Sequence, residues 1–236
     1  MKRRWGASSV LGVACALMLT AAKPADPPAD VVWTHPNPLR LGITTIAVLP
    51  VVVLDGGAQA ASLVEKSVPW SWMPTGHAWL QASSSREFLK APGGEGLLRE
   101  LTDQVRREGR VDSAAAQRLA RVLHMGAFLA VRVDRWERHE RDRTQLKAKP
   151  SFTAVGLRLA LVDSAGTLLW SASGAEVLQE AQRAGEPAAG GPWGMRPGAL
   201  GMGLRTVSTA PPFEDVLAKL LARWKPLFLG AARRST

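Results

Sequence analysis

The chain contains no tyrosine and a single cysteine, Cys15, among its 236 residues. An intramolecular disulfide needs two cysteines, so a disulfide-stabilised fold is excluded. The four histidines, His35, His77, His124 and His139, are far apart and match no HExxH zinc motif. Beyond the amino-terminal leader, no stretch reaches the roughly 20 apolar residues that a membrane-spanning helix needs. We therefore expect neither a metal nor any other cofactor.

Motifs of common enzyme sites are also missing. No GxSxG element is present, which is the local motif that positions a serine nucleophile in α/β-hydrolases. The glycine-rich stretch 93–96 precedes a predicted helix, but it lacks the lysine and hydroxyl residue that end a phosphate-binding loop. We interpret it as a flexible start to that helix. The sequence thus favours a protein that is not an enzyme.

The positive charge of the chain does not indicate nucleic-acid binding. The net charge is +10, and the densest basic stretch is 135–149, RWERHERDRTQLKAK. Acidic residues alternate with basic ones there, which is typical of a solvated hairpin. A single-strand-binding surface would add several stacking aromatics, whereas this stretch has only Trp136. We expect no nucleic-acid partner.

Residues 1–22 have the layout of a secretory signal peptide, with a basic start, an apolar middle and small residues at the end. Two processing routes fit. Cleavage after Ala22 leaves small residues at the required positions, and this is the route we expect. Lipidation of Cys15 is the alternative, although Gly12 stands where leucine is usual. Either route places the protein in the periplasm or on the periplasmic face of the outer membrane, with a lipid anchor only in the second.

The five prolines of residues 23–40 predict an extended tether, and residues 41–229 then read as one domain. Within it, 55–94 is a tryptophan-rich insertion, and 183–212 is a glycine- and proline-rich loop. The stretch 110–137 predicts a helix that Asp112 caps, a glycine terminus at Gly126, and an alternating strand. Further elements are expected as strands at 41–53 (broken at Pro50), 109–111, 151–163 and 167–173, and as helices at 58–68, 95–108 and 213–224.

This order predicts an α/β two-layer sandwich, in which helices cover one face of a mixed sheet of about four to five strands. Alternation places six apolar side chains on the buried face of the sheet, beneath the helices at 113–124 and 213–224. These six are Leu129, Val131, Val133, Leu157, Leu159 and Leu161.

The same alternation places Arg132, Trp136, Arg158 and Trp170 together on the opposite face. Arginine and tryptophan are enriched in the energetically dominant residues of protein interfaces. This quartet is our candidate partner-binding surface. The alternative is that a loop, or the tryptophans of 70–79, covers it.

Three stretches resemble the CsgG-like and TolB amino-terminal-domain group of bacterial envelope proteins. They are IAVLP at Ile46–Pro50, GRVDSAAAQRLARVLHMGAFLAVRVDRWE from Gly109, and LRLALVDSAGTLLWSASG at Leu157–Gly174. The resemblance implies an envelope location and a non-catalytic role through protein contacts, and it carries over no functional residue.

Two functions follow. The leading hypothesis is a non-enzymatic envelope accessory or assembly protein that acts through contacts with an envelope protein partner. The alternative is a periplasmic small-ligand binder or hydrolase, with its site in the Trp70–Trp79 loop and His77 as the titrating group. A pocket uniting His77 with a carboxylate would favour the alternative.

Overall fold

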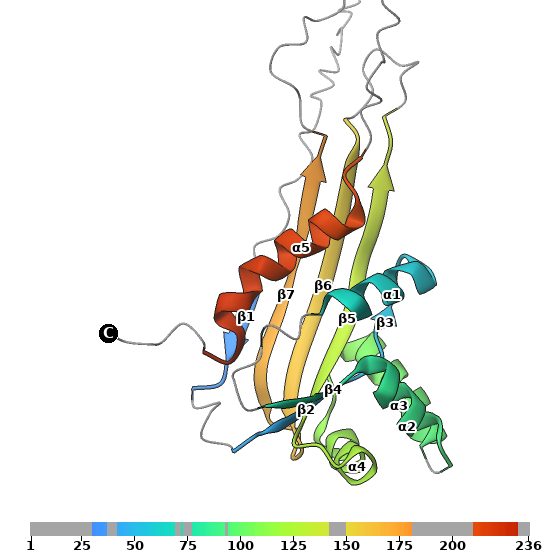
Figure 1. Ribbon diagram of the computed structural model, residues 1–236, viewed down its shortest axis with the longest axis vertical. Helices are drawn as coiled ribbons and strands as arrows, with labels where there is room; N and C mark the ends of the chain where they lie inside the picture. The colour runs from blue at the N-terminus through green and yellow to red at the C-terminus, as the bar shows by residue number, and fades with distance from the viewer. Residues whose placement is uncertain are drawn as a thin grey trace, which may run out of the picture.

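The computed structural model describes residues 30–36, 42–68, 72, 77–92, 94–141, 150–180 and 210–230. A mixed sheet of seven strands runs through this part of the chain (Figure 1). The predicted mixed α/β class is confirmed, although the sheet has more strands than the four to five expected. The difference arises because short apolar segments outside the long strands also pair with the sheet.

The strands follow the order β1-β7-β6-β5-β2-β4, and β3 also pairs with β5. Three long strands, β5, β6 and β7, form an antiparallel meander, while β2, β3 and β4 run parallel to β5 or to one another. Their bounds are β1 Val31–Thr34, β2 Thr45–Val48, β3 Val52–Val53, β4 Ala78–Leu80, β5 Ala127–His139, β6 Phe152–Asp163 and β7 Leu168–Gln179.

The break predicted at Pro50 separates β2 from β3. Proline has no amide hydrogen to donate to a ladder, so strand pairing is interrupted there. Both strands pair parallel to β5, at Phe128 for β2 and at Arg132 for β3. Despite the interruption, β2 and β3 therefore follow one another along β5, at the edge of the antiparallel meander.

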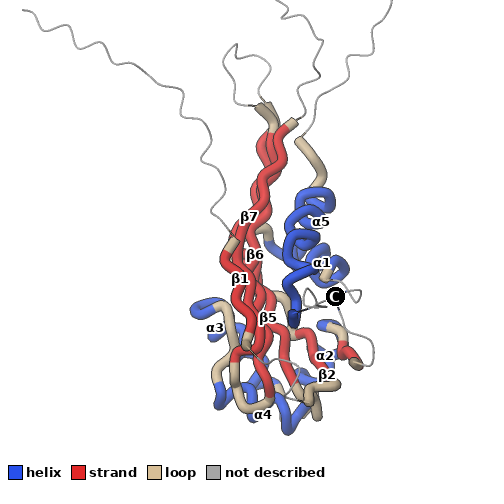
Figure 2. Tube along the Cα trace, turned by 90° about the vertical axis from the view of Figure 1, so that its left-hand side faces the viewer, coloured by secondary structure: helices blue, strands red, loops and turns tan. Residues whose placement is uncertain are grey.

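Helices pack on both faces of the sheet, not on one as the sequence predicted (Figure 2). Helices α1 (Gly57–Ser67) and α5 (Phe213–Trp224) cover what we call the α5 face. Helices α2 (Ala82–Lys90), α3 (Glu95–Glu108) and α4 (Ser113–Leu123) cover the other, the α4 face. A 3-10 helix, η3 (Lys225–Gly230), follows α5.

The second core exists because β5 is apolar on both sides. Leu129, Val131 and Val133 face α5, as predicted, whereas Phe128 and Ala130 face α4. All six predicted core side chains do share the α5 face. The predicted position of the 113–124 helix above them is wrong, because that helix packs on the opposite side.

Helix α4 begins as predicted and ends differently. The Asp112 carboxylate accepts a hydrogen bond from the Ala115 amide at 2.8 Å, which satisfies a first-turn donor. The helix ends at Leu123, and His124 rather than Gly126 takes the left-handed conformation, with φ of 53°. The amide of Gly126 instead donates to Thr45 Oγ1 at 2.9 Å, which ties the start of β5 to β2.

Three other stretches differ from expectation. Val31–Thr34 lies within the predicted tether, yet it forms β1 because its apolar residues can pair with β7. Helix α2 lies in the predicted insertion, where Leu89 gives it a residue for the α4-face core. Residues 109–111 form no strand, since Gly109 ends α3 with φ of 73°.

Candidate functional site

The predicted Arg/Trp quartet is divided between the two faces of the sheet. Trp136 and Trp170 are 7% and 0% exposed and lie in the α5-face core. Trp136 stacks on Phe213 of α5 with ring centroids 4.3 Å apart. Arg132 and Arg158 are cross-strand neighbours on the α4 face. The expectation of one exposed face holding all four side chains is therefore wrong.

A bulge in each of two strands explains this error. The pairing of β5 with β6 shifts between Val133 and Arg135, so one extra residue restores Trp136 to the face of Val133. The pairing of β6 with β7 shifts between Leu161 and Val162, and this second shift places Trp170 directly opposite Leu161. Directly opposed residues in a sheet share a face, so Trp170 is buried with the leucines.

Arg132 has a structural role in the described fold. Its guanidinium donates to the carbonyl of Arg106 at 2.9 Å and forms an ion pair with Asp134. A cation at the carboxyl end of a helix satisfies its last carbonyls and favours the helix dipole, here that of α3. Arg158 is more exposed, and its Nε lies 3.8 Å from Asp134 Oδ2. Of the quartet, Arg158 is the member that remains accessible.

The exposed apolar residues near Arg158 are on β1. Val31 and Trp33 are 66% and 41% exposed, and both point to the α4 face because they pair with Ser173 and Ser171. β1 is an edge strand of the sheet, so its outer backbone edge has no partner strand in the described part of the chain. We call Val31, Trp33 and this edge the β1 surface.

A small cavity of about 190 Å³ borders the β1 surface. Its floor includes the small side chains Ser171 and Ser173, and its opposite wall is the turn between α3 and α4 at Gly109 and Arg110. Arg158 also lines it. A Cβ at Gly109 would come within 2.2 Å of the Arg158 side chain, so the turn approaches the sheet closely at this wall.

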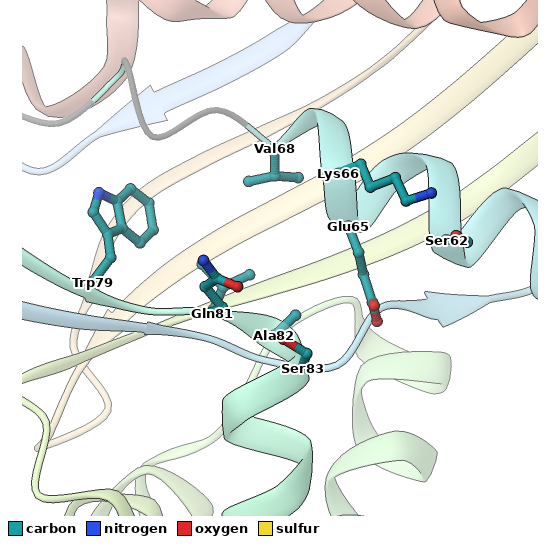
Figure 3. A pocket seen from close by; sticks show the side chains of 9 residues that line it. Ser62, Glu65, Lys66, Val68, Trp79, Gln81, Ala82 and Ser83 are labelled. Carbon is teal, nitrogen blue, oxygen red and sulfur yellow. The ribbon is translucent and has the colours of Figure 1, made fainter.

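A larger cavity, of about 430 Å³, lies between α1 and the start of α2 (Figure 3). Val48, Val68 and Ala82 are buried residues of its wall, and Trp79 of β4 adds an indole ring. Exposed polar residues complete the lining: Ser62 and Lys66 from α1, and Gln81 and Ser83 at the beginning of α2. We call this the α1–α2 cavity.

The charges of this cavity do not cancel. Glu65 lines it, but its carboxylate is ion-paired with Arg86 and lies 3.5 Å from the amide of Val51. Lys66 also lines it, and no ion pair of Lys66 is found among the described residues. One positive charge is therefore left at the rim.

His77 is not among the residues that line the α1–α2 cavity, although Trp79 is. The α1–α2 cavity is therefore not the pocket, uniting His77 with a carboxylate, that would have favoured the alternative function. Within the described ranges, no group of three or more histidine, cysteine, aspartate or glutamate residues could hold a metal ion. No helix in the same ranges is long and apolar enough to cross a membrane.

Several predictions concern residues outside the described part of the chain. These are the 1–22 leader with Cys15, residues 23–29 and 37–40 of the tether, Trp70, the hairpin residues 142–149, and residues 183–209 of the long loop. They remain predictions.

Sequence reasoning missed Val31, Trp33, Lys66 and Gln81. The signal for the first two was present, because VVWT is the only apolar run within the proline-rich stretch 23–40. Lys66 and Gln81 carry no local signal, since they line one cavity only in the folded chain, one on α1 and the other at the end of β4.

No protein-family model matches this chain. No curated protein matches it either. The resemblance to the CsgG-like and TolB amino-terminal-domain group therefore stays a hypothesis.

Several solved structures are similar at low identity. The lipoprotein GNA1162 from Neisseria meningitidis aligns over 58% of this chain and 83% of its own, with 19% identity and a TM-score of 0.36. The PelC dodecamer from Paraburkholderia phytofirmans aligns over 64% and 81%, with 17% identity and a TM-score of 0.34. The hypothetical protein CT253 from Chlamydia trachomatis aligns over 80% and 99%, with 13% identity and a TM-score of 0.37.

Proposed function

We propose that this chain is an exported, non-enzymatic accessory protein of the bacterial cell envelope, and that it binds an extended segment of a partner protein along β1. The observation that carries this proposal is the β1 surface, where Val31 and Trp33 are exposed side by side on an edge strand. Export rests on the leader-like residues 1–22. The absence of catalytic function rests on the scattered histidines and missing motifs of the sequence.

The chemistry of the partner follows from the geometry of the edge. Edge strands present unpaired backbone groups, and natural proteins usually protect them with charged residues or proline. β1 instead exposes valine and tryptophan, which suits a partner strand that adds its own backbone hydrogen bonds. Such a strand needs apolar residues at alternate positions to cover Val31 and Trp33.

Site-specific crosslinking tests this assignment. A photoreactive phenylalanine analogue in place of Trp33 should crosslink in cells to an envelope protein, through a segment with alternating apolar residues. The same analogue in place of Phe88, which is 54% exposed on α2, is the matched control. Adding Val31→Lys should abolish the Trp33-position crosslink, because a charge then lies on the β1 surface.

Equal crosslinking from positions 33 and 88 would contradict the proposal. So would a crosslink only to a second copy of this chain, which would make β1 an oligomer interface. A crosslink that survives Val31→Lys would mean that β1 is not the contact.

A further inference from the structure

We propose that the α1–α2 cavity binds a small carboxylate ligand with an apolar or aromatic body. This inference is independent of partner binding at β1, because the cavity lies at the opposite end of the sheet order, beside β2 and β4. It rests on the topology at the ends of β2 and β4, on the residues that line the cavity, and on the positive charge of Lys66.

The topology places the cavity at a switch point of the parallel strands. β2 lies between β5 and β4 and runs parallel to both. After β2 the chain continues through β3 to α1 on the α5 face, and it leaves the carboxyl end of β4 towards α2, α3 and α4. Connections that diverge to opposite faces open a crevice at the carboxyl ends of neighbouring strands, where ligands of open α/β sheets bind.

Part of the lining comes from these strand ends. Val48 is the last residue of β2, and Gln81 is the first residue after β4. Figure 3 shows Trp79 and Gln81 on one side of the space and α1, with Val68, Glu65 and Lys66, on the other. The cavity therefore lies between these strand ends and α1.

The size and wall of the cavity suit a small organic molecule. Ligand sites commonly have volumes of about 300–1,000 Å³, with an apolar wall and a few polar groups that fix orientation. Here the volume is about 430 Å³. Val48, Val68 and the indole of Trp79 supply apolar contact, and Gln81, Ser62 and Ser83 supply hydrogen-bonding groups.

Charge selects a carboxylate as the polar end of the ligand. Arg86 already neutralises Glu65, so a cationic ligand would have to compete with an existing ion pair. Lys66 supplies the positive charge that has no ion-pair partner among the described residues. The first turn of α2 adds backbone amide donors, because the side chain of its N-cap residue, Gln81, does not hydrogen-bond to them. An ionised acceptor gains more from these donors than a neutral one.

The test is a titration of the folded full chain with three carboxylates, benzoate, phenylacetate and indole-3-acetate, each compared with its own amide. Two-dimensional ¹H–¹⁵N NMR follows the backbone amides of Gln81 and Ser83. We expect at least one carboxylate to shift both signals saturably and to bind about tenfold more tightly than its amide, since a hydrogen bond to a charged group contributes about that much.

Lys66→Gln should remove the preference for the carboxylate and leave binding of the amide unchanged. Lys90→Gln is the matched control, because Lys90 is an exposed lysine at the far end of α2 and outside the lining. Ser83→Asp should also weaken carboxylate binding without unfolding, because an acidic residue stabilises the first turn of a helix. Val31→Lys should have no effect on either ligand.

Three outcomes would overturn the proposal. The first is that no carboxylate of the panel shifts Gln81 and Ser83. The second is equal affinity for carboxylate and amide. The third is a carboxylate preference that Lys66→Gln leaves intact.

Discussion

Trp33 and Trp170 stand on paired strands, yet their surroundings differ completely. Trp170 is paired with Thr34, directly beside Trp33, and its side chain is 0% exposed. Its ring meets Phe228 edge-on, with centroids 4.9 Å apart, and Trp72 at 6.3 Å. Trp33 points to the other face and is 41% exposed. A shift of one residue in the pairing of β1 with β7 therefore separates a position in the core from a position on the surface.

Replacing each tryptophan by alanine should give contrasting changes in the free energy of unfolding. Trp170→Ala removes a fully buried ring and should cost about 3–5 kcal/mol. Trp33→Ala, the same chemical change on the β1 surface, should cost less than about 1 kcal/mol. Urea denaturation of both variants measures the difference. Similar losses in the two variants would show that the register of β1 against β7 is wrong.

At the scale of elements, α5 is held to the ends of the long strands through the residues just before it. Ala210 lies at the end of β5: its amide donates to Glu140 at 3.0 Å, and its carbonyl accepts from Arg138 at 3.1 Å. The Thr153 hydroxyl of β6 donates to the carbonyl of Pro211. These contacts set where the chain returns to the sheet, and α5 follows across β6 and β7 (Figure 1).

The Glu140 contact predicts a dependence of stability on pH. The hydrogen bond from the Ala210 amide, aided by Arg138, lowers the pKa of the Glu140 carboxyl from its ordinary 4.5. A lowered pKa means that the fold prefers the ionised form. The stabilisation is therefore complete above about pH 4.5 and is lost as the pH falls through the folded-state pKa.

Glu140→Gln should accordingly lower the urea midpoint at pH 7, and the gap to the parent should narrow as the pH falls below about 4.5. The loss at pH 7 should stay below about 1 kcal/mol, because the group is exposed and solvent screens it. Glu137→Gln, which removes an exposed carboxylate paired with Arg135 on the same strand, is the control. A gap that is equally large at pH 3 would contradict this account of Glu140.

At the scale of the whole molecule, two cores share one sheet. The α5-face core holds Leu159 and Trp170, and the α4-face core holds Leu119 and Phe128. Strand β5 contributes side chains to both, and it is the only long strand that also pairs with β2. Loss of either core should expose one side of β5 and weaken its packing on the other.

We therefore expect a single unfolding transition for both cores. Leu159→Ala and Leu119→Ala should each cost about 2–5 kcal/mol, as buried leucines do. Four buried tryptophans, Trp72, Trp136, Trp170 and Trp224, lie in the α5-face core, so fluorescence reports mainly on that side. Leu119→Ala should nevertheless shift the fluorescence midpoint as far as the midpoint by circular dichroism. Two separated transitions would mean that the cores are independent.

Prediction of the site from sequence was limited by bulges. Strict alternation correctly grouped Leu129, Val131 and Val133, which precede the bulge in β5. It failed at Trp136, because one inserted residue reverses the facing of everything that follows. The lining of the α1–α2 cavity could not be predicted either. Lys66 of α1 and Trp79 of β4 line one cavity only in the tertiary structure, where β4 pairs with β2, and local sequence does not encode that pairing.

The sequence by itself determined the elements whose causes are local. Asp112 caps α4, Pro50 interrupts the strand after β2, and the spacing of Val216, Leu217 and Leu220 defines α5. Hydrogen bonds within a turn and the period of apolar residues are sufficient for these. Only the tertiary structure decided that helices occupy both faces and that β1 is an exposed edge. Those features depend on which strands pair and in what register, and pairing is a competition between segments far apart in the chain.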